Sequence, residues 1–190
     1  MIGYDHHFGR NREGSFEHLK EFGPLYGFEV EEISAQDIDE VNVSSTKVRR
    51  ALLEGNVKVA STYLGHPFRL SGRVIDGAKN GRKLGFPTAN IEIKETYKLI
   101  PLVGIYAVYA YYEGIRYKGM LNIGFRPSID SSDGSMSIEV NIFDFNQDIY
   151  GRDLKVDLIK RIRNEKKFDS IEELIAEMKK DKSKTERILR

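Results

Sequence analysis

The sequence predicts a mainly β fold: a six-stranded antiparallel barrel of Greek-key-like topology with a C-terminal helix, preceded by a partial α/β segment. Two observations lead to this prediction. Between residue 68 and about residue 160, six β-rich stretches follow one another, mostly across short turns, and closure of such a sheet removes its exposed edges. Residues 1–60 instead alternate strand and helix signals, which is the order of a parallel α/β sheet. We therefore expect two domains, at residues 1–60 and 61–190.

The first segment has too few elements for a complete sheet. Its expected elements are a strand end over 1–5, a helix over 16–22, a strand over 28–33, a helix that ends at Gly55 and a second helix over 56–64. Asn56 is a favourable N-cap for the last of these, and Gly65 is a favourable stop. Because the buried strands of a parallel sheet need neighbours on both sides, we expect this segment to be only part of a domain.

The second segment supplies the barrel. Its expected strands cover residues 68–75, 88–93, 104–112, 116–123, 137–145 and 154–160. Glu113-Gly114 fits a tight hairpin between the third and the fourth. The last helix is expected to begin with a capping box at Ser170 and to lay an apolar stripe on the barrel, formed by Ile171, Leu174, Ile175 and Met178. After Lys179 the charged pattern predicts a solvated helix end.

Composition narrows the classes of function. A net charge of +1 gives no basic excess of the kind that a nucleic-acid surface requires. Cysteine is absent, which rules out disulfides, thiol catalysis and thiolate zinc sites. No apolar run is long enough to span a membrane, and the first residues lack the apolar core of a signal peptide. We expect a cytoplasmic protein that binds neither nucleic acid nor membrane, and composition leaves its oligomeric state open.

Residues 72–90, GRVIDGAKNGRKLGFPTAN, have the composition of a phosphate-binding loop. Gly77, Gly81 and Gly85 let the main chain approach an anion closely, and Arg82 with its neighbouring lysines adds positive charge. A membrane helix-packing motif is excluded because the stretch is charged. The alternative of an ordinary basic surface loop stays open on these residues alone, since they do not match the Walker pattern.

The end of this stretch, Pro87-Thr88-Ala89-Asn90, favours a binding site. Proline fixes φ just before a hydroxyl and an amide that can both face a bound phosphate or ion. A second anion site is expected where a strand passes into the helix that ends at Gly55. Its hydroxyls and its cation are Ser44, Ser45, Thr46 and Arg49. Plain helix capping is the alternative for this second group.

Several motifs in one order resemble the riboflavin kinase domain. They are GRKLGFPTAN (81–90), NIGFRPS (122–128), SIEVNIFDF (137–145), DIYGRDLKV (148–156) and RNEKKFDSIEEL (163–174). Upstream, GYDHHFGRNREG (3–14) and VSSTKVRRAL (43–52) resemble the C-terminal half of the FMN adenylyltransferase domain that precedes this kinase in bacterial bifunctional FAD synthetases. The resemblance implies a Rossmann-like nucleotidyltransferase remnant over residues 1–60 and a riboflavin kinase domain over residues 61–190.

The resemblance also implies an activity, transfer of the ATP γ-phosphoryl group to the 5′-hydroxyl of riboflavin to give FMN, with Mg²⁺. The residues implied to bind ATP are Gly77, Gly81, Arg82, Gly85, Pro87, Thr88 and Asn90. Among them, Thr88 would bring its hydroxyl to Mg²⁺, and phosphates and water would supply the other ligands. Glu139 holds the position of the catalytic base, although a lone glutamate in an alternating strand is more often a solvent-facing residue.

The flavin side is less closely defined. The resemblance places Arg126 in a flap beside the flavin, where a structural salt bridge is an equal alternative. Ser128 and Ile129 depart from the family pattern in this flap. An apolar slot for the flavin ring is expected between the barrel and the last helix, with Phe168, Leu174 and Tyr106 as loose candidates.

One family motif is missing. The adenylyltransferase domain of the family begins with a strand and a G-x-F-D-G-x-H-x-G-H motif, which this sequence lacks. His6 and His7 belong to the later GYDHHFG segment and are not that motif. We expect an N-terminally truncated chain that does not adenylylate FMN by itself.

Two other classes of function stay open. A non-catalytic flavin- or nucleotide-binding barrel would bind its ligand without producing FMN. A nucleic-acid-binding barrel would stack bases on strand aromatics, for which the candidates are Tyr106, Tyr109, Tyr111 and Tyr112. The charge balance disfavours the second of these classes.

Overall fold

The chain forms two compact units, Met1–Ser44 and Ser45–Arg190. The computed structural model describes residues 2–3, 7–30, 32–33, 37–38, 41–77, 81, 84–125 and 136–190. The units divide earlier than the boundary expected at residue 60, because the two helices that follow Ser44 belong to the same unit as the barrel. The boundary at residue 60 describes family domains rather than compact units, and it stays a prediction.

The first unit contains one described helix and short strand pairs. β1 (Ile2–Gly3) runs parallel to β2 (Glu32–Ile33), and β3 (Asp37–Ile38) is antiparallel to β4 (Val41–Asn42). Between β1 and β2 lie a 3₁₀ turn, η1 (Arg10–Arg12), and α1 (Phe16–Tyr26). The parallel β1–β2 pair agrees with the expected α/β order, whereas a Rossmann-like assignment stays a prediction.

Helix α1 is longer than the sequence suggested. The expected end at Phe22 was placed before Gly23-Pro24, but both residues lie inside the helix. The helix ends instead at Gly27, whose φ of 72° is left-handed. The next residue closes the end, because Phe28 N donates to Gly23 O at 3.0 Å in the manner of a Schellman motif.

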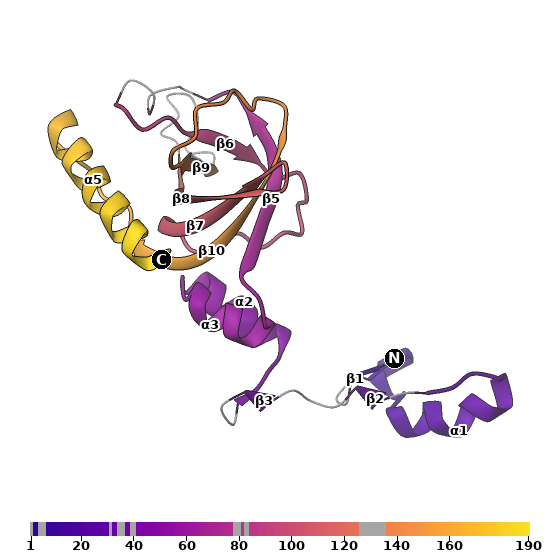
Figure 1. Cartoon of the computed structure of the whole chain (residues 1–190). Helices are drawn as coiled ribbons and strands as arrows, with labels where there is room; N and C mark the ends of the chain where they lie inside the picture. Colours follow the sequence, from indigo (N-terminus) through magenta and orange to yellow (C-terminus); the bar gives the residue numbers. More distant parts are fainter. Residues whose placement is uncertain are drawn as a thin grey trace. The chain divides into compact units, whose positions relative to one another are not determined.

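The second unit is a closed barrel (Figure 1). Its strands are β5 (Phe68–Ile75), β6 (Ala89–Glu92), β7 (Gly104–Tyr112), β8 (Ile115–Phe125), β9 (Met136–Ile142) and β10 (Asp153–Arg163). They are joined in the order β10-β5-β6-β9-β8-β7, and every pair is antiparallel. The links from β6 to β7 and from β9 to β10 join strands that are not neighbours. The prediction of a six-stranded antiparallel barrel is confirmed.

Strand β10 closes the barrel because it pairs with both β5 and β7. An ion pair on the outer surface spans its seam with β5: Arg69 Nε contacts Asp157 Oδ1 at 2.6 Å and Nη2 contacts Oδ2 at 2.8 Å. The Asp157 side chain is 6% exposed, and its hydrogen bond raises the pKa of Arg69. Two-point pairing of this kind fixes direction as well as distance.

The barrel interior is filled by alternate strand residues. Buried members include Leu70, Val74, Tyr106, Val108, Leu121, Ile123, Val140, Leu154, Val156 and Leu158. Burial raises the pKa of Tyr106, and its hydroxyl donates to Leu102 O. Tyr106 and Tyr112 are buried in this core. They therefore cannot form an exposed stacking surface or line a slot beneath the last helix.

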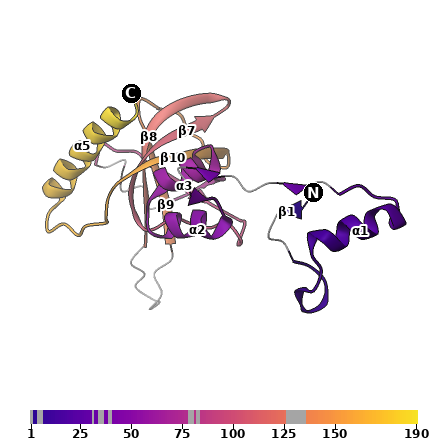
Figure 2. The same cartoon turned by 90° about the horizontal axis from the view of Figure 1, so that it is seen from below.

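The helices α2 (Ser45–Leu53) and α3 (Val57–Leu64) lie at one end of the barrel (Figures 1 and 2). Asn56 caps α3, as expected, by accepting from Val59 N at 3.5 Å, and Gly65 ends the helix with φ 74°. Leu52, Val57 and Ala60 belong to the same core as the barrel interior, and Leu102 N donates to Leu52 O at 3.1 Å. The helix pair therefore closes the core at this end.

The last helix, α5 (Ile171–Ile188), runs along the side of the barrel (Figure 1). Ser170 accepts from Glu173 N at 3.2 Å, which is the N-cap half of the expected capping box. Ile175 and Met178 of the expected stripe pack against Phe86, Met120 and Phe143. Ile171, however, is 60% exposed.

The prediction of a solvated end after Lys179 is wrong. Asp181, Thr185 and Leu189 follow one another every four residues on one helix face, and each is at most 1% exposed. A charged residue tolerates this burial because Arg163 Nη2 of β10 lies 2.7 Å from Asp181 Oδ2. An ion pair between distant segments is not visible in local hydrophobic periodicity.

Replacing Asp181 by alanine should destabilise the second unit by about 3 kcal/mol, because the mostly buried Arg163 would lose its close partner and keep only the longer contact with Glu177 Oε1, at 3.9 Å. Thermal or urea unfolding measures the loss. The control is Glu54→Gln, which removes the exposed pair with Arg50 and should change stability by less than about 0.5 kcal/mol. Equal effects of the two changes would contradict a structural role for the buried pair.

Candidate active site

Three adjacent strands place polar side chains side by side on the outer face of the barrel. Glu139 of β9 is the register partner of Asn90 of β6 on one side and of Asn122 of β8 on the other. Their neighbours in sequence point into the core, for example Ile91 after Asn90 and Val140 after Glu139. Because side chains alternate along a strand, the three polar residues face outward together.

The Pro-Thr-Ala-Asn segment is held against β9. Thr88 Oγ1 donates to Glu139 Oε2 at 3.4 Å, and Asn141 Nδ2 donates to Pro87 O at 2.7 Å. Thr88 and Glu139 are half-buried, whereas Asn90 is 7% exposed. The structure thus brings together four residues that the sequence proposed for the site: Pro87, Thr88, Asn90 and Glu139.

The glycines before this segment are required by close approach. A Cβ on Gly77 would lie 2.0 Å from Asn90 Nδ2, and one on Gly81 would lie 2.3 Å from Phe86 O and 3.1 Å from Thr88 Oγ1. Phe86 N donates to Gly81 O at 2.8 Å. Of Gly77, Gly81 and Gly85, only Gly85 has a left-handed φ, 79°. Gly77 and Gly81 therefore let the loop pack on Asn90 and Thr88.

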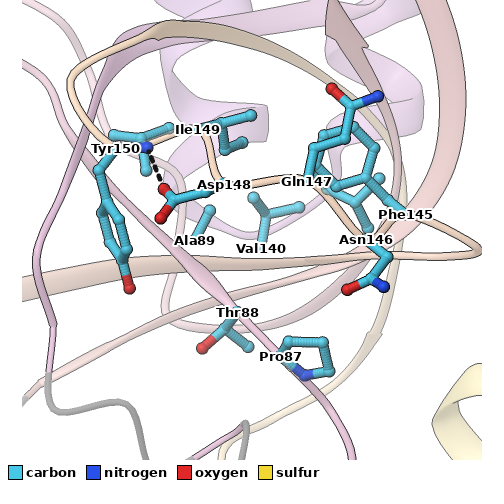
Figure 3. A pocket seen from close by; sticks show the side chains of 12 residues that line it. Pro87, Thr88, Ala89, Val140, Phe145, Asn146, Gln147, Asp148, Ile149 and Tyr150 are labelled. Carbon is cyan, nitrogen blue, oxygen red and sulfur yellow. Dashed lines mark hydrogen bonds between the residues drawn. The ribbon is translucent and has the colours of Figure 1, made fainter.

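A cavity of about 430 Å³ lies beside Thr88 (Figure 3). Pro87 and Thr88 lie on one side of it, and residues 145–150 line the other. Asp148 shapes that loop, because its Oδ1 accepts from Tyr150 N at 3.1 Å. Val74, Val140 and Ile149 add apolar surface. An apolar floor with polar groups at the edge suits a heterocyclic ring.

The donor set fits a magnesium site completed by phosphates. Thr88, Asn90 and Glu139 offer hydroxyl, amide and carboxylate oxygens, which are the ligands that Mg²⁺ prefers. Within the residues that the structure describes, there is no group of three or more His, Asp or Glu that could hold a metal ion. Any Mg²⁺ here would therefore take most of its ligands from phosphates and water.

Some proposed residues stay predictions. Arg82 and Arg126 lie outside the described residues, as do His6, Ser128 and Ile129. The second predicted anion site lies at the beginning of α2, where Ser44, Ser45, Thr46 and Arg49 are all exposed.

The surface between α5 and the barrel, expected to hold a flavin ring, contains packed side chains. Phe86, Met120 and Phe143 meet Ile175 and Met178 there. Phe168 lies beside two cations, with Arg163 Cζ at 5.9 Å and Lys166 Nζ at 5.3 Å from its ring centroid. The space that these five side chains fill therefore cannot hold a flavin ring.

The sequence did not identify several residues at the site. Asn122 lies across from Glu139 but has the sequence pattern of an ordinary polar position in an alternating strand. Residues 145–150 line the cavity, a role that the sequence did not indicate. Strand alternation does predict that Asn141 shares the face of Glu139, but it does not indicate the contact of Asn141 with Pro87 O.

No helix within the described part of the chain is both long and apolar enough to cross a membrane.

The chain is similar to known proteins in sequence and in structure. The family model described as riboflavin kinase matches residues 64–189, and one described as FAD synthetase matches residues 1–47. A bifunctional riboflavin kinase/FMN adenylyltransferase of Bacillus subtilis (strain 168) is 40% identical over 185 residues, which is 96% of this chain and 57% of that protein. A protein of the same description from Pseudomonas fluorescens is 41% identical over 173 residues, covering 91% of this chain and 55% of the relative.

A solved structure is also similar. The crystal structure described as a macrolide-efflux protein from Streptococcus pneumoniae matches with a TM-score of 0.84 and 36% identity, over 97% of this chain and 58% of that one. The chain thus spans just over half the length of these relatives. Because the riboflavin kinase model matches more than half of the chain, including the whole barrel and the residues around Glu139, the chain belongs to the riboflavin kinase family.

Proposed function

We propose that the protein transfers the γ-phosphoryl group of ATP to the 5′-hydroxyl of riboflavin and produces FMN. The observation that carries the proposal is the arrangement of Thr88, Asn90 and Glu139. A carboxylate lies 3.4 Å from a hydroxyl beside a glycine loop and a cavity for a ring. Family membership supports the substrates, riboflavin and ATP.

The side of the site next to β6 binds ATP in this proposal. The adenine ring of ATP occupies the cavity between Thr88 and residues 145–150. The phosphates of ATP then reach the loop from Gly77 to Gly85. Main-chain donors of that loop, together with Arg82, bind the phosphates. Phosphoryl transfer depends mainly on positioning and on neutralising charge, and the close packing of Gly77 on Asn90 and of Gly81 on Thr88 helps to position the loop.

Thr88, with Asn90 beside it, would hold a Mg²⁺ ion through side-chain oxygen. The ion, when bound, neutralises charge on the phosphate oxygens. Thr88 also donates to Glu139 Oε2, so the same hydroxyl orients the carboxylate. Asn141 donates a hydrogen bond to the carbonyl of Pro87, the residue before Thr88. This contact limits movement of the Thr88 backbone.

Glu139 accepts the proton from the riboflavin 5′-hydroxyl as that oxygen attacks phosphorus. Glu139 pairs with β6, on the proposed ATP side, and with β8, on the proposed riboflavin side. The NIGFRPS segment begins in β8. Arg126 of that segment is proposed to order the flavin-side flap or to contact the substrate phosphate.

A direct assay tests the proposal. The 190-residue chain is incubated with riboflavin, ATP and Mg²⁺, and riboflavin, FMN and FAD are then separated. We expect FMN that depends on all three components, and no FAD. Flavin binding without FMN would instead favour a non-catalytic module, and FAD would contradict the expectation that these residues alone do not adenylylate FMN.

Changing Glu139 to glutamine should lower kcat by about 10²-fold or more, because the amide cannot accept the proton. The fold should persist, which circular dichroism and thermal unfolding can verify. Glu113→Gln, in the exposed turn between β7 and β8, is the matched control and should keep full activity. Near-normal turnover of the Glu139 variant would remove this residue from the role of base.

Changing Gly77 to alanine should raise the KM for ATP and lower kcat. The added Cβ would lie only 2.0 Å from Asn90 Nδ2 and would push the Asn90 amide out of its place. We expect a loss in kcat/KM on the order of 10²-fold. Gly27→Ala is the control: it strains a left-handed φ of 72° in the first unit, where a Cβ meets no atom within 4 Å. It should leave FMN formation unchanged. Equal activity of both variants would contradict the packing role of Gly77.

A further inference from the structure

Asn122 has an unsatisfied acceptor beside the proposed base. Its Oδ1 is buried and has no hydrogen-bond partner within the described part of the structure. It lies directly across from Glu139 in the β8–β9 ladder. A buried acceptor without a donor costs free energy, so such an atom in a folded protein calls for an explanation.

Packing in the barrel interior does not explain why an amide stands at position 122. Leu121 and Ile123, its neighbours along β8, are fully buried in the interior, so alternation turns Asn122 to the outer face. Other polar groups on this face are satisfied within the protein: Thr88 donates to Glu139 and Asn141 donates to Pro87 O. An apolar β-branched side chain at position 122 would suit a strand and would avoid the unsatisfied oxygen.

The position of Asn122 indicates which molecule could supply a donor. The proposed ATP side of Glu139 is formed by β6 and the glycine loop, whereas Asn122 lies on the other side, on β8. The phosphoryl acceptor must reach Glu139 opposite the phosphate, because attacking and leaving oxygens lie roughly in line. The acceptor chain therefore passes over the face where Asn122 lies.

We propose that Asn122 determines specificity for the acceptor: its Oδ1 accepts a hydrogen bond from the hydroxyl next to the one that is phosphorylated. This inference rests on the proposed kinase function. Directly opposite residues in an antiparallel pair have Cβ atoms about 4.5 to 5.5 Å apart, so Glu139 and Asn122 can each bind one of two neighbouring hydroxyls. The preferred acceptor is then a chain with vicinal hydroxyls, as in the ribityl group.

The test is a cycle of two enzymes and two substrates. Wild type and Asn122→Ala are each assayed with riboflavin and with its 4′-deoxy analogue, which lacks the neighbouring hydroxyl. A site that binds a substrate hydroxyl discriminates strongly against the analogue without it, so we expect wild type to lose about tenfold or more in kcat/KM with the analogue. In Asn122→Ala, riboflavin should lose about as much, and the two substrates should differ by less than about threefold.

Two further variants separate specificity from folding. Asn122→Val also lacks the acceptor, and valine suits a strand. It should show the same reduced discrimination between the substrates, and it provides the test if Asn122→Ala folds poorly. Asn56→Ala removes the cap of α3 and should lower stability while keeping the wild-type ratio between the substrates.

The outcomes distinguish this inference from the function on which it rests. If wild type phosphorylates riboflavin but treats the analogue equally, or if both Asn122 variants keep the wild-type ratio, the inference is overturned and the kinase function stands. If wild type forms no FMN, the kinase function and the inference fail together.

Discussion

The pairing between β6 and β9 is the constraint on which barrel and site both depend. It consists of two register pairs, Ala89 with Val140 and Asn90 with Glu139. Ala89 and Val140 of the first pair face the core. In the second pair, the Asn90 amide lies beside the proposed base, Glu139, on the outer face. Because proline has no N–H for a ladder, Asn141 extends the contact through its side chain to Pro87 O. A shift of one residue would turn Glu139 into the core and remove it from Thr88.

Much of the barrel could be predicted because its strands carry strong local signals. The strands expected over 68–75 and 104–112 are those observed as β5 and β7, and the ends of the others differ by a few residues. The buried end of α5 could not be predicted in the same way, because the ion pair of Asp181 with Arg163 joins segments whose distance in space local periodicity does not encode. Helix α1 passed through Gly23-Pro24 because its end depends on Gly27 and Phe28 rather than on propensity alone.

The site was predictable where motif and chemistry coincide, and less so where geometry alone decides. Thr88, Asn90 and Glu139 combine a recognisable order with suitable functional groups, and the structure brings them together. Asn122 begins the NIGFRPS motif but was given no chemical role, since an amide in an alternating strand looks like any surface residue until the lack of a partner is seen. Gly77 and Gly81 also have a role that the sequence did not indicate, because they give room to the chain's own side chains and main chain; their contact with phosphate stays a prediction.

The double pairing of β10 has a consequence for how the chain folds. Its partners on β5 precede it by 80 to 90 residues, and until β10 is in place one edge of β5 and one edge of β7 lack a neighbouring strand. Contacts of such long range are slow to form. During synthesis from the N-terminus, the barrel can close only after nearly all of its residues have left the ribosome, and α5 follows β10. The unclosed barrel would expose two strand edges to other chains, so this late step is where intermolecular pairing competes with correct folding.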